Sequence, residues 1–233
     1  MLTNIVNVGT SLVTTAARAA TGISVGKVGA RPEKRLELYE FEGCPFCRKV
    51  REALSILDLE ADIYPCPKNG PRFRPEVVKR GGRAMFPYLV DPNADVEMYE
   101  SDEIVRYLFD RYGDGRVPMM LALGPLTDVN SALAGLARPG LGGFYRKAEE
   151  PREPLELYSF EASPFCRIVR ERLSTLELPY VLRNVAKGSP SRKAFVERSG
   201  KMQVPYLVDP NTGTEMFESA DIVAYLDREY ASR

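Results

Sequence analysis

The chain contains an internal duplication, which constrains its fold more than any other feature. Residues 36–57 read LELYEFEGCPFCRKVREALSIL and residues 155–176 read LELYSFEASPFCRIVRERLSTL, with 16 of 22 positions identical. Residues 87–110 and 205–228 repeat in the same way, with 15 of 24 positions identical. Because chance does not produce two such blocks in the same order, the chain carries two copies of one folding unit. The first unit spans residues 35–112 and the second spans residues 154–233.

Each unit predicts the same succession of elements. The residues from Leu36 alternate in polarity like a strand, and Pro45 then opens a helix. Further strands are expected over 60–64, 87–90 and 96–99. A short helix over 75–80 ends at two glycines, and a last helix covers 101–112. The sequence therefore predicts an α/β protein with two tandem βαβαββα units.

Two segments lie outside these units. Residues 1–34 form an N-terminal segment, whose first 32 residues contain no acidic residue and three basic ones. That composition is typical of a transit peptide, but the apolar spacing equally fits a mature helix that packs on the body or on a partner. Residues 113–153 form a linker that is apolar over 121–137, where we expect one or two short helices starting near Thr127 or Asp128. Both segments are candidate surfaces for a protein partner.

The composition excludes several classes of function. Lys+Arg and Asp+Glu both number 32, so the chain lacks the basic excess that nucleic-acid binding needs. It has no histidine, which excludes Ser-His-Asp and Cys-His catalysis and His-ligated zinc. No apolar run is long enough to predict a transmembrane helix. A single C-x-x-C without further ligands points to redox chemistry, and no metal is expected.

The C-x-x-C motif lies where the first strand turns into a helix. Cys44 is expected at the helix N-terminus, where free N–H groups and the helix dipole stabilise a thiolate. Cys47 is within disulfide reach, Arg48 adds positive charge, and Glu40 and Glu42 oppose ionisation. The motif predicts Cys44 as the nucleophile and Cys47 as the resolving thiol. The alternative is a pair of inert, half-buried cysteines.

Three motifs occur in order in both units, and together they resemble the thioredoxin superfamily, specifically glutaredoxins and the N-terminal domain of glutathione S-transferases. The sequence Cys-Pro-Phe-Cys is a glutaredoxin-type variant. The resemblance implies a cis-proline beside the active site and a Glu-Ser pair that holds the γ-glutamyl carboxylate of glutathione at a helix start. The matching residues are Phe86-Pro87 and Val204-Pro205 for the cis-prolines, and Glu100-Ser101 and Glu218-Ser219 for the pairs.

The resemblance also implies further contacts with glutathione. The backbones of Phe86 and Val204 would pair with the tripeptide, and Arg83 and Lys201 are candidate partners of its glycine carboxylate, with Gln203 as a further candidate. Each of these polar side chains could instead be a solvated surface residue. Phe41 stands where many glutaredoxins carry a lysine.

The second unit departs from the first at its active-site motif, which reads Ser163-Pro-Phe-Cys166. Serine cannot carry out disulfide exchange, although it resembles the catalytic serine of some plant glutathione transferases. Those enzymes need a C-terminal helical domain, and only residues 231–233 follow the repeat, so we do not expect a full transferase. We predict a degenerate second site. Cys66 is expected to be a buried thiol, with glutathionylation as the alternative.

The whole chain resembles a plastid family of plants and algae with tandem domains of this type, which implies a chloroplast location. We therefore predict a glutathione-linked thiol–disulfide oxidoreductase that acts on glutathione or a protein disulfide. The alternative is a non-catalytic accessory subunit of a larger plastid assembly, such as a photosynthetic one. A [2Fe–2S] cluster held by Cys44 and glutathione is a third hypothesis, and Pro45 argues against it.

Overall fold

Each repeat folds into the same mixed α/β unit in the computed structural model, which describes residues 8–12, 21–122 and 140–232. The first unit contains β1 (Leu36–Glu40), α2 (Pro45–Ile56), β2 (Ala61–Pro65), α3 (Phe73–Gly81), β3 (Tyr88–Asp91), β4 (Val96–Met98) and α4 (Ser101–Tyr112). The second contains β5 (Leu155–Ser159), α7 (Pro164–Thr175), β6 (Tyr180–Asn184), α8 (Ser191–Ser199), β7 (Tyr206–Asp209), β8 (Thr214–Phe217) and α9 (Ser219–Tyr230). The predicted βαβαββα order is confirmed in both units.

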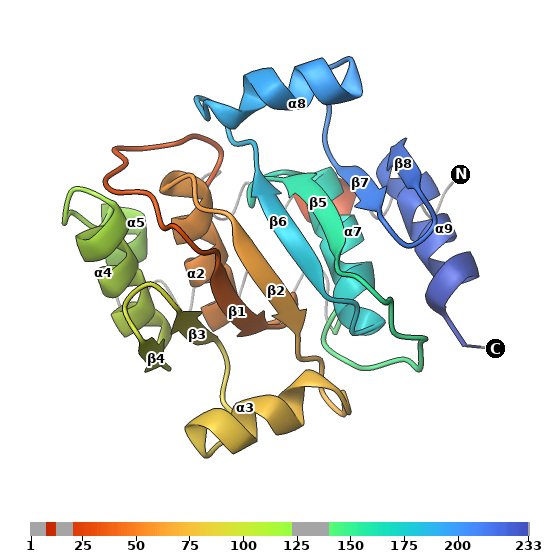
Figure 1. Ribbon diagram of the computed structural model, residues 1–233, viewed down its shortest axis with the longest axis horizontal. Helices are drawn as coiled ribbons and strands as arrows, with labels where there is room; N and C mark the ends of the chain where they lie inside the picture. Colours follow the sequence, from red (N-terminus) through yellow and green to blue (C-terminus); the bar gives the residue numbers. More distant parts are fainter. Residues whose placement is uncertain (1–7, 13–20, 123–139, 233) are drawn as a thin grey trace.

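The two units share one eight-stranded sheet with the order β4-β3-β1-β2-β6-β5-β7-β8 (Figure 1). The junction is the antiparallel pairing of β2 with β6, in which Asp62 lies opposite Val181. These two residues are 119 positions apart, which is also the spacing between the first sequence blocks, so a pseudo-twofold axis passes through this pair. Each unit thus covers the edge strand that the other would otherwise expose.

The alternation of side chains along the strands separates two layers of core. One face of the sheet carries a single apolar cluster that spans both units and includes Leu38, Leu54, Leu157 and Leu173 from β1, α2, β5 and α7. The other face carries two small clusters, which include residues of α3 in the first unit and of α8 in the second. In Figure 1, α8 lies at the top of the view and α3 at the bottom, beyond opposite ends of the strands. The shared cluster joins the units into one body.

Ion pairs between the units are buried at the same junction. Arg51 Nε lies 3.0 Å from Glu161 Oε2, and Arg170 Nε lies 3.0 Å from Glu42 Oε2. These contacts are related by the pseudo-twofold axis, and each joins one unit to the other. Arg51 also contacts Glu40. The side chains in these pairs are 2–3% exposed, so each charge depends on its partners for solvation.

Burial and the arginines act differently on the two carboxyl groups of the first unit. Burial raises the pKa of Glu40 to about 7, and Arg51 offsets that effect only in part. Burial also opposes ionisation of Glu42, but Arg170 and Arg51 outweigh it and lower the pKa of that group to about 2. Ser159 occupies the position equivalent to Glu40 in the second unit. The two ion pairs that join the units are therefore related by the pseudo-twofold axis, whereas Glu40 has no counterpart in the second unit.

Each unit is preceded by an arm that lies on the other unit. The arm over residues 21–25 bonds to the second unit through Val25 N–H to Lys187 O at 2.8 Å. The arm over residues 143–145 bonds to the first unit through Tyr145 N–H to Lys68 O at 3.0 Å. Both contacts are parallel bridges to equivalent lysines. Segments that the sequence comparison left outside the repeats therefore take part in the same pseudo-twofold arrangement.

The N-terminal segment also contacts the body. Residues 8–12 are helical, and Ser11, which is fully buried, donates from Oγ to the Pro164 carbonyl at 2.8 Å. Within the linker, α5 (Met119–Ala122) buries Leu121 in the shared core. The predicted helix start near residues 127–128 lies outside the described residues. Among the helices that are described, none has the length and apolar character to cross a membrane.

Replacing Arg51 with Met tests the junction. The variant leaves Glu40 buried without its guanidinium partner and leaves Glu161 with Arg170 but without Arg51, so we expect the free energy of unfolding to fall by about 3–5 kcal/mol. Denaturant unfolding followed by circular dichroism measures it. Arg106→Ala is the control, because it removes an exposed pair with Glu103 and should cost less than about 1 kcal/mol. Equal effects of the two changes would contradict a structural role for the buried pairs.

Candidate functional site

Cys44 is the N-cap residue of α2. Its backbone is extended, and its Sγ accepts a hydrogen bond from the Cys47 N–H at 3.3 Å. Pro45 follows in the first turn, where its missing N–H costs nothing. The sulfur therefore points at free N–H groups of the helix start, which favour a negative charge.

The two thiols of the motif differ in acidity. Burial opposes ionisation of Cys44, but hydrogen bonds from the Cys47 thiol and backbone lower the pKa of Cys44 below its ordinary value. Burial and the neighbouring Cys44 raise the pKa of Cys47 well above its ordinary value. This difference suits a nucleophile followed by a resolving thiol. The charge of Glu40 raises the pKa of both groups.

Cys44 is only 4% exposed. One wall beside it comes from the arm that precedes the second unit, because a Cβ added to Gly43 would lie 3.2 Å from the Leu141 carbonyl oxygen. The missing side chain of Gly43 lets the two backbones approach closely here. A disulfide substrate can reach the sulfur only if part of this cover moves.

The remaining cysteines are buried and reduced. Cys66 is fully buried and its Sγ lies 3.4 Å from the Tyr64 carbonyl, as expected for an inert thiol. Burial raises the pKa of Cys66 well above its ordinary value and also raises that of Cys166. Neither has the thiolate character that reactivity requires.

Both predicted cis peptides are present, at Phe86-Pro87 and Val204-Pro205. Phe86 lies edge to face with Phe41, at 6.2 Å between ring centroids, which brings the cis-proline strand beside the loop that leads into Cys44. The guanidinium of Arg74 lies over the Phe86 ring at 4.7 Å. Arg74 is not recognisable as a neighbour of the motif from the sequence, because nothing in the local pattern around α3 places it there.

The third motif lies at the start of α4. Glu100 has φ 66°, and its equivalent Glu218 has φ 67°, a conformation that glutamate rarely adopts. Ser101 follows as a buried residue of the first helical turn. The buried ammonium of Lys49 on α2 pairs with Asp102, which joins the first and third motifs. Strain repeated at two equivalent positions indicates a functional constraint on this turn.

The second unit assembles the same elements around a hydroxyl. Ser163 caps α7 by accepting the Cys166 N–H at 3.2 Å. A cavity of about 250 Å³ adjoins this helix start, and Gln203 Nε2 donates to Glu218 Oε1. The cavity is lined by Val8, Phe165, Ile168, Glu218, Ser219, Ala220 and Val223. Residues 205 and 218–219 thus remain in place although the reactive thiol is missing.

The two predicted carboxylate partners make equivalent aromatic contacts. The guanidinium of Arg83 lies 4.9 Å from the ring centroid of Tyr99, and Lys201 Nζ lies 4.3 Å from that of Phe217. Their role toward glutathione stays a prediction. Within the described ranges, no group of three or more Cys, Asp or Glu side chains is arranged to hold a metal ion.

The chain matches the family model for the glutathione S-transferase N-terminal domain twice, over residues 38–116 and 157–233. It belongs to this family. Both matches fall on the units that carry the cis-proline and the Glu-Ser pair. Membership in the family supports a glutathione-related function for the thioredoxin-like units.

A glutathione transferase from Bombyx mori is similar in sequence over part of its length. Identity is 27%, the match covers 36% of this chain and 38% of the transferase, and the TM-score is 0.33. The matched part is thus well under half of the transferase. No curated protein matches the sequence.

The acidity of Cys44 can be measured directly. In the variant Cys47→Ser/Cys66→Ser/Cys166→Ser, Cys44 is the one thiol left, and its alkylation rate should rise with pH around a midpoint below about 8.5. Adding Glu40→Gln should lower that midpoint further, because it removes a negative charge that opposes the thiolate. A midpoint at or above about 8.5 would contradict an activated thiol.

Proposed function

We propose that the first unit is a glutathione-linked thiol–disulfide oxidoreductase, with Cys44 as nucleophile and Cys47 as resolving thiol. The observation that carries the proposal is the position of Cys44 as the N-cap of α2, where its Sγ accepts the Cys47 N–H at 3.3 Å; the opposite shifts of the two thiol pKa values support it. Membership in the glutathione S-transferase N-terminal family supports glutathione as the reductant. The cis-proline and the Glu-Ser turn beside the motif support a binding surface for the tripeptide.

The proposed cycle begins with attack of the Cys44 thiolate on one sulfur of a disulfide substrate. The S–S bond breaks, one substrate thiolate leaves with the electron pair and takes up a proton, and a mixed disulfide forms on Cys44. Cys47, after losing its proton, attacks Cys44 Sγ and releases the second substrate thiol. Two glutathione molecules then reduce the Cys44–Cys47 disulfide and are oxidised to glutathione disulfide. Alternatively, when the mixed disulfide joins Cys44 to glutathione, a second glutathione thiolate attacks the glutathione sulfur. Cys44 then leaves as a thiolate and glutathione disulfide is released.

We expect the second unit to bind glutathione without reacting with disulfides. Ser163 reproduces the N-cap of Cys44 without a thiol, and Cys166 is buried. The hydrogen bond between Gln203 and Glu218 and the cavity beside Glu218 and Ser219 support a binding surface for glutathione in this unit. We therefore propose a degenerate second site that supports the first unit structurally.

A non-catalytic role remains the second candidate, and the burial of Cys44 favours it. A Cys44 residue that is 4% exposed, close to the segment before the second unit, suits a protein whose thioredoxin-like surfaces serve assembly. This role would be that of an accessory subunit in a plastid complex.

Imaging the full chain fused to a fluorescent protein in plant cells tests the proposed chloroplast location.

Reduction of a small glutathione-containing disulfide by the full chain, coupled to glutathione reductase, tests the enzymatic proposal. We expect Cys44→Ser to lower the rate to that of the uncatalysed reaction, because serine cannot attack a disulfide at neutral pH. Cys166→Ser is the matched control and should retain the full rate. An inactive wild-type chain would favour the accessory role.

Glutathione binding can be tested separately from turnover. We expect Ser101→Ala to weaken glutathione binding by about tenfold, because one hydrogen bond to a carboxylate is lost. Isothermal titration calorimetry of the Cys44→Ser background measures the affinity without reaction. Ser219→Ala reports on the second unit in the same assay, and an unchanged affinity in the Ser101 variant would contradict a γ-glutamyl site at α4.

A further inference from the structure

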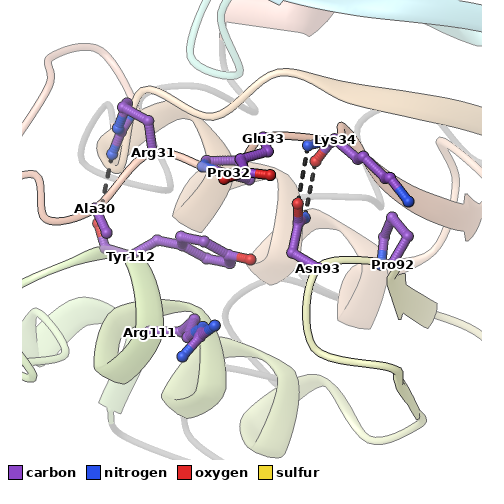
Figure 2. Close-up of a pocket in the computed structure, with 9 residues that line it drawn as sticks. All are labelled: Ala30, Arg31, Pro32, Glu33, Lys34, Pro92, Asn93, Arg111 and Tyr112. Carbon is purple, nitrogen blue, oxygen red and sulfur yellow. Dashed lines mark hydrogen bonds between the residues drawn. The ribbon is translucent and has the colours of Figure 1, made fainter.

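A polar cavity of about 490 Å³ lies between the segment before β1, the β3–β4 turn and the end of α4 (Figure 2). Cys44 caps the N-terminus of α2, whereas Arg31 in the cavity wall reaches the carbonyl of Leu57 just past its C-terminus. A helix of this length separates the two places by about 18 Å. The cavity is lined by Ala30, Arg31, Pro32, Glu33, Lys34, Pro92, Asn93, Arg111 and Tyr112.

Hydrogen bonds hold the walls of the cavity in place. Asn93 accepts the Lys34 N–H at 2.8 Å and donates from Nδ2 to the Lys34 carbonyl at 2.8 Å, which ties the segment before β1 to the β3–β4 turn. Figure 2 shows this pair of bonds at one side of the cavity. Arg31 donates to the Leu57 and Tyr112 carbonyls, at 2.8 and 3.4 Å. The guanidinium of Arg31 is therefore committed to the scaffold.

Two further cations line the cavity: Lys34, and Arg111, whose guanidinium also interacts with the Tyr112 hydroxyl. In the part of the chain that the structure describes, the side chains of Lys34 and Arg111 have no carboxylate within ion-pair distance. Glu33 contributes an opposing charge, so three cations face one acid. A ligand with two negative charges would balance the excess positive charge of the side chains that line the cavity.

The second unit repeats the hydrogen bonds that hold the cavity walls, but the charged side chains at the equivalent positions have the opposite sign. Asn211 accepts the Glu153 N–H at 2.9 Å and donates to the Glu153 carbonyl at 3.0 Å, as Asn93 does with Lys34. Glu229 takes the position of Arg111, and Arg152 that of Glu33. A helix C-terminus favours cations, and α9 meets this preference with Arg228, one position before Glu229. The second unit therefore folds with no cation at the positions equivalent to Lys34 and Arg111.

We propose that this cavity binds the phosphate group of a small phosphorylated metabolite. Lys34 supplies a mobile point charge and Arg111 a planar fork that suits phosphate oxygens. The rings of Pro32, Pro92 and Tyr112 offer apolar walls for the organic part of the ligand. The volume lies in the range of cavities that hold small molecules. The site is separate from the thiol chemistry and does not rest on it.

Titration of the full chain with ribose 5-phosphate tests the site, with ribose as the uncharged match. We expect amide chemical-shift changes that centre on Lys34, Asn93 and Arg111, and no comparable changes with ribose. Lys34→Glu/Arg111→Glu should weaken the apparent affinity by at least about tenfold. If that variant fails to fold by circular dichroism, Lys34→Gln/Arg111→Gln removes the charges with less repulsion and should weaken binding in the same direction.

Lys79→Glu/Lys193→Glu is the control variant, because it makes the same change in net charge at exposed positions on α3 and α8. Equal weakening by this control would overturn the site, since binding would then reflect overall charge. Equal binding of ribose, or displacement by succinate at the same concentration as effectively as by phosphate, would overturn the assignment to a phosphate. Cys44→Ser should bind ribose 5-phosphate unchanged, so failure of the thiol chemistry leaves this proposal intact.

Discussion

The pairing of β2 with β6 is the contact on which the rest of the structure depends. It turns two four-stranded sheets into one and brings the loops after β1 and β5 together across the axis. Those loops carry Glu42 and Glu161, whose charges are balanced by arginines from the opposite unit. Burial of such charges is costly unless every partner is present. The two units are therefore specified as a pair, in one register and one orientation.

The same arrangement explains how two nearly identical units can differ in chemistry. Both helix starts are capped by a side chain at the same position, and both keep the cis-proline and the strained glutamate. A sulfur is present at one and an oxygen at the other, so the fold is satisfied while one unit alone offers a disulfide-exchanging nucleophile. Glu40 has no equivalent acid in the second unit. It places a carboxyl group with a pKa of about 7 beside the thiols of the first unit.

Much of this could be predicted from the sequence, because the information is local or repeated. The repeat defined the units, Pro45 and the glycines marked helix ends, and the cis-prolines followed from the family resemblance. The boundaries of α3 differ from prediction by one or two residues, since helix ends depend on neighbouring packing. The eight-stranded sheet and the buried ion pairs join residues more than 100 positions apart, which no local pattern encodes. For the same reason the sequence predicts Arg48 only as a positive charge beside the C-x-x-C motif and does not mark Arg51, although both are buried.

The crossing arms have a consequence for how the chain can be divided. Because residues 21–25 lie on the second unit and residues 143–145 lie on the first, neither unit is complete without a segment that precedes the other. A cut between the units would leave two fragments. Each would expose the edge strand, β2 or β6, that pairs with the other fragment, and each would carry the arm that lies on the other fragment. Such fragments have the design of a split protein: they would recover the native arrangement by associating with one another, at a rate set by their concentration.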